Sequence, residues 1–334
     1  MNAIAICAGS TVIYWSGMII ALGIAAGFAL TYSLYTSYVG TGRPLWVLLP
    51  AAVFFSVVFC RLLHWYCHME QYTGLLNALT DYSGGGYCLS GAVLGVLTAA
   101  YLTGRLGFTG NAARMLDAAA PGAALCAAFI RLSALFNSSC RGKIVITRPA
   151  LQHLPLASPV YTGGAAEYRF AAFFVEFLVL LAVSAALLRF YFSRRSIEMR
   201  GRESSDGHTA RMLLLLFSAV EFIFDSTRYD SSFMHLNGFI SIVQVFSAAS
   251  MLALLIYYSR MSVRVSGRSG RRAGLWIGWG VSLICAALAE YLVQRHGDWY
   301  GRCYLLMFTG LAGMTAAVYA MYLGCCTQPE REEE

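Results

Sequence analysis

The strongest constraint on the fold is the repeated occurrence of long apolar segments along the chain. Of the 334 residues, 58% are hydrophobic and 12% are charged, whereas about 25% of the residues of a soluble domain are charged. An apolar segment of about 20 residues is long enough to cross a bilayer as a helix. The sequence therefore predicts an all-α polytopic membrane protein. We predict nine spanning helices: Val12–Tyr32, Leu45–His64, Tyr87–Thr103, Ala118–Asn137, Ala171–Phe192, Met212–Thr227, Gly238–Tyr258, Ala273–Val293 and Cys303–Gly324.

The positions of the arginines predict the orientation of these helices. If the N-terminus lies outside, most arginines fall in loops on the inner side, including the two densest clusters, residues 189–211 and 260–272. Inner loops of membrane proteins carry an excess of basic residues, so we predict the N-terminus outside and the C-terminus inside. The net charge of +7 follows from this orientation and does not indicate nucleic-acid binding.

One arginine, Arg131, lies within the predicted helix Ala118–Asn137. It shares a helical face with Asp117, but the two residues are about 21 Å apart along the axis and cannot pair. An arginine at bilayer depth costs at least ~2.5–3.5 kcal/mol on insertion scales, so it must face a partner or a polar cavity. The alternative is a structural role, in which Arg131 donates hydrogen bonds to backbone carbonyls between helices.

Other polar residues are expected at the same depth in the membrane. In the predicted orientation all of them lie towards the outer leaflet, which predicts a cavity open to the outer leaflet or outer face. The inner half of the helices has no matching ionisable residues, which argues against a transporter. The residues concerned are Arg61, Ser90, Arg131, Glu176, Glu221, Asp225, Arg228 and Gln244.

The histidines and cysteines do not predict a metal or cofactor site. His64 and His68 are four residues apart, beside Cys67 and Glu70, which places two imidazoles on one helical face. Two imidazoles alone do not define a metal site, so we expect this segment to anchor the helix at the membrane interface. The ten cysteines show no paired spacing and are expected to be small buried residues.

Several segments together resemble the prolipoprotein diacylglyceryl transferase family. The segments GGGYCLSGAVLGV and DAAAPGAALCAAFIRLSALFNSSCRG resemble two of its motifs, and further matches are WSGMII, CRLLHW, RFAAFFVE, EFIFDSTR and Gln244. The resemblance covers about residues 12 to 260, in the family's order. It implies a seven-helix transferase-like core, residues 1–262, followed by about two additional helices and an acidic tail, residues 263–334.

The resemblance also implies an activity and a location. Members of this family transfer the diacylglyceryl group of phosphatidylglycerol to a lipobox cysteine thiol of a prolipoprotein. The implied partners are phosphatidylglycerol or a similar anionic lipid and a prolipoprotein signal peptide, and the implied location is the bacterial cytoplasmic membrane. The family positions that this chain retains are Arg61, Arg131, Asn137, Gly142, Arg169, Glu176, Arg228 and Gln244.

The chain departs from the family pattern at reactive positions. Ser90 replaces the histidine of one motif, Ser16 the tyrosine of the first helix, and Ala134 the first asparagine after the central arginine. In the sixth helix Phe217 replaces a tyrosine and Glu221 replaces an arginine.

These departures leave two hypotheses open. In the first, the protein is a transferase in which Arg131 holds phosphate and Glu221 is the base. The remaining candidate residues would then bind substrate: Arg61, Ser90, Asn137, Gly142, Glu176, Arg228 and Gln244. In the second, it is a non-catalytic lipid- or lipoprotein-binding protein on the same scaffold.

Overall fold

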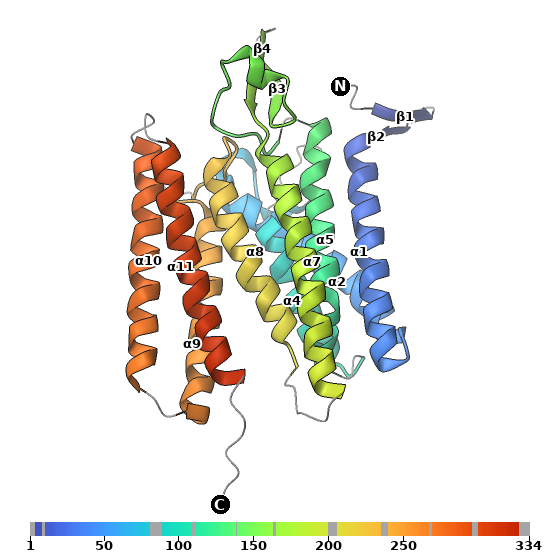
Figure 1. The fold of residues 1–334 in the computed structure, drawn as a ribbon. Helices are drawn as coiled ribbons and strands as arrows, with labels where there is room; N and C mark the ends of the chain where they lie inside the picture. Colours follow the sequence, from blue (N-terminus) through green and yellow to red (C-terminus); the bar gives the residue numbers. More distant parts are fainter. Residues whose placement is uncertain are drawn as a thin grey trace, which may run out of the picture. The chain divides into compact units, whose positions relative to one another are not determined.

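The computed structural model describes residues 4–8, 11–80, 89–108, 111–137, 139–162, 165–199, 206–234, 240–266, 269–295 and 300–326. This part of the chain is mostly helical, which confirms the predicted all-α class (Figure 1). The long helices are α1 (Trp15–Val39), α2 (Arg43–Cys67), α4 (Leu89–Arg105), α5 (Ala112–Leu132), α7 (Ala172–Met199), α8 (His208–Thr227), α9 (Ile242–Ser266), α10 (Ser269–Arg295) and α11 (Tyr300–Cys326). Shorter elements are α3 (Leu75–Thr80), α6 (Pro149–Gln152), and the 3-10 helices η1 (Met69–Gln71) and η2 (Ser133–Phe136).

Within the described residues, seven helices are long and apolar enough to cross a membrane: α1, α2, α5 with η2, α7, α9, α10 and α11. The predicted spans Tyr87–Thr103 and Met212–Thr227 correspond to α4 and α8, which are not among the seven. The described part of α4 has 17 residues, and α8 carries Arg211, Glu221 and Asp225. The ends of two predicted spans, Tyr87 and Gly238, and the acidic tail lie outside the described residues.

The sequence analysis did not predict the two antiparallel hairpins that precede α1 and α7 (Figure 1). Strands β1 (Ile4–Ala8) and β2 (Thr11–Tyr14) form the first, and β3 (Ala157–Thr162) and β4 (Ala165–Phe170) form the second. These four strands are too short to be recognised in the sequence beside the much stronger helical pattern of the neighbouring apolar segments.

The chain divides into two compact units, which do not coincide with the predicted boundary at residue 262. The first unit comprises Met1–Leu213 and Thr227–Gly238, and the second comprises Leu214–Ser226 and Phe239–Glu334. The units reflect where contacts cluster, whereas the predicted boundary marks the extent of a family resemblance, so that boundary stays a prediction.

In the first unit, helices approach closely where glycines face a neighbouring backbone. A Cβ atom built on Gly27 of α1 would lie 2.6 Å from the carbonyl oxygen of Gly122 in α5. Similarly, a Cβ atom on Gly91 of α4 would lie 2.5 Å from the backbone nitrogen of Cys60 in α2. Small residues at such positions allow van der Waals contact between membrane helices, which lack a hydrophobic driving force for association in lipid.

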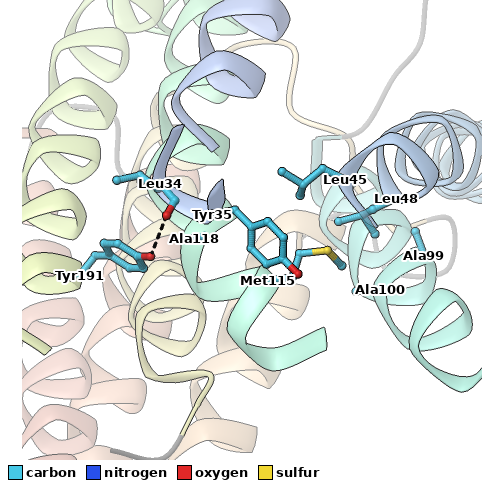
Figure 2. Close-up of a cluster of buried hydrophobic side chains, with 9 residues drawn as sticks. All are labelled: Leu34, Tyr35, Leu45, Leu48, Ala99, Ala100, Met115, Ala118 and Tyr191. Atoms are coloured by element: carbon cyan, nitrogen blue, oxygen red, sulfur yellow. Dashed lines mark hydrogen bonds between the residues drawn. The ribbon is translucent and has the colours of Figure 1, made fainter. Parts of the chain in front are cut away.

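An apolar cluster packs residues of α1, α2, α4, α5 and α7 against one another (Figure 2). The Tyr191 hydroxyl donates a hydrogen bond to the Leu34 carbonyl, 3.3 Å away, and so joins α7 to α1. Met115 of this cluster and Arg131 both belong to α5, and they are about 24 Å apart along the helix axis. Arg131 and this apolar cluster therefore lie towards opposite ends of α5. The cluster consists of Leu34, Tyr35, Leu45, Leu48, Ala99, Ala100, Met115, Ala118 and Tyr191.

Asp117 of α5 holds the start of α8. Its carboxylate accepts hydrogen bonds from the backbone N–H groups of Gly207, at 2.6 Å, and Ala210, at 2.8 Å. A carboxylate stabilises a helix N-terminus by satisfying its exposed N–H groups and by interacting favourably with its dipole. Arg114 strengthens the connection through an ion pair with Asp206, at 3.3 Å.

The second unit contains α9, α10, α11 and most of α8. Helices α10 and α11 pack closely, and a Cβ atom on Gly310 would lie 2.7 Å from the Ser282 carbonyl oxygen. Glu290 of α10 is buried in this unit, with 4% of its surface exposed. The sequence analysis omitted Glu290, although a carboxylate within an apolar segment was the available signal.

Candidate functional site

The candidate site is built around a carboxylate shared by two arginines of the first unit. Arg131 lies in the last turn of α5, Glu176 near the start of α7, and Arg228 directly after α8. The Arg131 Nε donates a hydrogen bond to Glu176 Oε1 at 2.8 Å, and Arg228 Nη2 donates to the same oxygen at 2.6 Å. Glu176 is completely buried. Arg131 thus has the partner that its position in an apolar helix required.

These three residues are brought together at one end of the first unit. The end of α5 continues into η2, where the ring of Phe136 stacks on that of Trp15 at the start of α1, with the ring centroids 6.0 Å apart. Helices α1 and α7 both begin at this end, directly after their hairpins (Figure 1). The predicted convergence of polar groups at one depth is therefore observed for Arg131, Glu176 and Arg228.

Backbone hydrogen bonds fix the segment that carries Arg228. Gly142 and Arg228 form an antiparallel bridge, and the Lys143 N–H donates to the Thr227 carbonyl at 2.8 Å. A Cβ atom on Gly142 would lie 2.9 Å from the Cβ of Phe170, so this position has no room for a side chain. Gly142 is therefore required for the close packing of this segment, and its predicted part in binding substrate stays a prediction.

A turn after η2 places a thiol beside Arg131. Asn137 Oδ1 accepts a hydrogen bond from the Ser139 N–H at 2.9 Å, which forms a local Asn turn. Cys140 follows with a positive φ of 55°, and its N–H donates to Asp230 at 2.8 Å. The Cys140 Sγ lies 3.6 Å from Arg131 Nη1. Asn137 therefore shapes the turn, and Cys140 is a site residue that the sequence analysis missed.

Arg141 is a second site residue that the sequence analysis missed. It is buried, and its Nη1 donates to the Ala134 carbonyl at 2.8 Å. Its guanidinium lies over the Phe173 ring, 4.7 Å from the centroid. Burial lowers the pKa of Arg141, an effect opposed by Tyr229, Cys140 and Asp230. Arginine remains charged under such shifts, so the site contains a further buried cation.

Arg61 and Ser90 have different surroundings. Arg61 is almost fully buried; its Nε donates to the Ala78 carbonyl at 2.9 Å, and its guanidinium lies 5.9 Å from the Tyr72 ring centroid. Arg61 thus secures α3 to α2, which is the carbonyl-binding role considered above for Arg131. Ser90 is buried at the start of α4, where the neighbouring Gly91 packs on the backbone of Cys60.

Glu221 and Gln244 belong to the second unit. Both are buried, Glu221 with 1% and Gln244 with 3% of its surface exposed. Gln244 Oε1 accepts a hydrogen bond from the Ser241 N–H at 3.4 Å, close to the start of α9. The roles predicted for these two residues stay predictions.

The two histidines of α2 interact with each other. The rings of His64 and His68 stack with centroids 4.3 Å apart, and His68 Nδ1 lies 3.1 Å from the His64 carbonyl oxygen. Among the described residues, no group of three or more His, Cys, Asp or Glu side chains is arranged to hold a metal ion.

The long apolar helices and the buried ion pairs define the chain as a multi-pass membrane protein with an internal arginine–carboxylate cluster. A family model, prolipoprotein diacylglyceryl transferase, matches residues 3–260. The chain belongs to this family, and the resemblance inferred from its motifs is confirmed. Helices α10 and α11 lie beyond the matched residues.

Similar curated proteins include phosphatidylglycerol–prolipoprotein diacylglyceryl transferases of Dehalococcoides mccartyi. Those of strains BAV1 and CBDB1 are each 29% identical to this chain over 160 residues, and that of strain 195 is 28% identical over the same length. The matched segment is 45% of this chain and 60% of each relative, so the chain spans less than two thirds of the length of these relatives.

Proposed function

We propose that the protein transfers the diacylglyceryl group of phosphatidylglycerol to the lipobox cysteine thiol of a prolipoprotein. The reaction takes place at the outer leaflet of the bacterial cytoplasmic membrane, with the N-terminus of the protein outside. The observation that carries this proposal is the gathering of buried guanidinium groups around one carboxylate. Arg131, Arg141 and Arg228 are buried cations, and Glu176 is the buried carboxylate that Arg131 and Arg228 share.

Guanidinium groups gathered in a buried place provide several donors of one charge, which suits the binding of an anion. A lipid phosphate is such an anion, and guanidinium groups bind phosphate through charge-assisted hydrogen bonds. The names of the relatives support phosphatidylglycerol as the lipid.

In the proposed reaction, the acceptor thiol loses its proton to a base and its sulfur attacks the diacylglyceryl carbon that carries the phosphate ester. A carbon–sulfur bond forms, the carbon–oxygen bond to phosphate breaks, and glycerol phosphate leaves with the bonding electrons. Negative charge grows on the leaving phosphate, where a positioned guanidinium stabilises it most strongly.

Arg131 is the residue proposed to hold this phosphate. Its Nε is committed to Glu176, whereas its Nη1 faces the sulfur of Cys140, a weak acceptor that a phosphate oxygen would replace. Glu176 fixes the orientation of the guanidinium, so that little reorganisation is needed when the lipid binds. Glu221 is proposed as the base, since Ser90 stands where the family has a histidine and cannot take up a proton at neutral pH.

The test is a transfer assay with purified protein in nanodiscs that contain phosphatidylglycerol, using a lipobox peptide as acceptor and mass spectrometry to detect the thioether. The variants are Arg131→Ala and Glu221→Gln, with Arg148→Ala as control because Arg148 is an exposed arginine outside the cluster. We expect product from the wild type and from the control, and little from the two site variants.

Absence of product from the wild type would exclude this reaction. Phosphatidylglycerol binding that depends on Arg131 but yields no product would instead identify the alternative, a non-catalytic lipid-binding protein. Product formation that survives both substitutions would refute the assignment of Arg131 and Glu221.

A further inference from the structure

The additional C-terminal helices contain a side chain that holds the end of α8. Tyr304, in the second turn of α11, donates a hydrogen bond from its hydroxyl to the Ser226 carbonyl oxygen at 3.2 Å. Both residues belong to the second unit. Helix α11 lies beyond the residues that match the family model, so this hydrogen bond comes from a part of the chain that the model does not cover.

The acceptor is a group that needs a partner. Ser226 is the penultimate residue of α8 and 1% exposed. The last four carbonyl groups of a helix have no acceptor role within it, and a buried carbonyl without a donor costs free energy. The Tyr304 hydroxyl supplies the donor and thereby restrains the last turn of α8.

The Tyr304 ring is itself well positioned. It stacks on the ring of Tyr300, one turn earlier in α11, with centroids 6.3 Å apart and planes inclined by 15°. Glu290 of α10, which is buried, interacts electrostatically with the Tyr304 hydroxyl. The stacking on Tyr300 therefore restrains the ring that carries this donor.

The restraint continues along the chain to the candidate site. Thr227 follows Ser226, and its carbonyl accepts a hydrogen bond from the Lys143 N–H at 2.8 Å. The next residue, Arg228, forms the bridge with Gly142 and donates to Glu176. Ser226, Thr227 and Arg228 are thus each held by a different hydrogen bond, and Arg228 is the residue that contacts the buried carboxylate of Glu176.

We propose that Tyr304 is a positioning residue for Arg228, acting along the chain through Ser226 and Thr227. The effect of Tyr304 on catalysis rests on the function proposed above, whereas its effect on the backbone hydrogen bonds around Arg228 does not. Without the Tyr304 hydroxyl, the last turn of α8 frays, and the backbone hydrogen bonds on either side of Arg228 open more often.

The test uses the full chain in nanodiscs and compares Tyr304→Phe, which removes only the hydroxyl, with Tyr319→Phe. Tyr319 is a matched control because it is an exposed tyrosine on the same helix. Hydrogen exchange measured by mass spectrometry reports the amides of Lys143 and Tyr229, which hydrogen-bond to the Thr227 and Arg141 carbonyls. We expect these amides to exchange about fivefold faster in Tyr304→Phe, the effect of losing one hydrogen bond.

A second measurement uses the transfer assay with the lipobox peptide. Tyr304→Phe should lower kcat about fivefold and leave the KM for the peptide unchanged, because the perturbation reaches the phosphate-binding cluster and not the acceptor. If the wild type forms no product, the proposed function fails, while the exchange measurement still decides the role of Tyr304.

Two results would overturn the proposal. One is exchange at Lys143 and Tyr229 that matches the Tyr319→Phe control. The other is faster exchange throughout the first unit together with a lower melting temperature, because that pattern indicates a general structural role and not local positioning.

Discussion

Replacing Glu176 by glutamine tests most directly whether the arginine cluster depends on a shared counter-charge. The substitution keeps the shape of the side chain and one acceptor oxygen, but it removes the negative charge that Arg131 and Arg228 share. Glu176 is completely buried, so water cannot compensate for the loss. Breaking a buried ion pair from one side costs about 3–5 kcal/mol, and we expect the lower part of this range because hydrogen bonding is partly retained.

The assay is unfolding of the purified protein in a non-ionic detergent, with Glu167→Gln as the matched control. Glu167 also pairs with an arginine, Arg169, at 2.8 Å, but its side chain is 35% exposed. An exposed pair of this kind contributes about 0–1 kcal/mol, so the control should unfold almost as the wild type does. The comparison therefore separates buried from exposed arginine–glutamate pairs in one protein.

Phosphatidylglycerol provides the second arm of this experiment. If the cluster binds a lipid phosphate, lipid at roughly one hundred times its Kd adds about 2.7 kcal/mol to the free energy of unfolding. Glu176→Gln should gain at least as much from the lipid as the wild type does, because the substitution removes one negative charge beside Arg131 and Arg228. The reasoning is refuted if Glu176→Gln is no less stable than Glu167→Gln.

Two further predictions concern the scaffold of the first unit. Gly27→Leu should separate α1 from α5 and lower the melting temperature, because even a Cβ atom there would lie 2.6 Å from the Gly122 carbonyl oxygen; Gly17→Leu is the control, since a Cβ atom at Gly17 has nothing within 4 Å. His208 precedes the predicted span at the start of α8, and burial, aided by Arg194 and Arg211, lowers its pKa from 6.5 to about 3. The unfolded chain therefore binds a proton below about pH 6.5 that the folded protein binds only near pH 3, so stability should fall as the pH decreases through this window. Unfolding measured from pH 7 to pH 4 should show a shallower decline for His208→Gln, and an unchanged decline would contradict the assignment to His208.

The sequence alone determined the fold class, the family and most of the helices. It did so because the preference of about 20 apolar residues for a helix across a bilayer is decided within the segment itself. The same local reasoning identified Arg131 as a buried charge in need of a partner, and Glu176 and Arg228 as residues at a comparable depth. Helix α8, the predicted span Met212–Thr227, is not among the helices apolar enough to cross a membrane by composition, because Arg211, Glu221 and Asp225 lie in it, so this span stays a prediction.

The tertiary structure decided which polar groups meet. Glu176 is 45 residues from Arg131 and 52 from Arg228 in the sequence, and their contact depends on the rotation and packing of α5 and α7, which apolar periodicity does not specify. The same holds for Arg61, whose partner is the Ala78 carbonyl of a short helix. Cys140 and Arg141 join the site through a turn with a positive φ, and Tyr304 reaches α8 from a helix 78 residues away. The local sequence therefore determines where each helix forms. The partners of the buried charged side chains are determined only when the helices pack, because a buried charge can pair only with the groups that packing brings within contact distance.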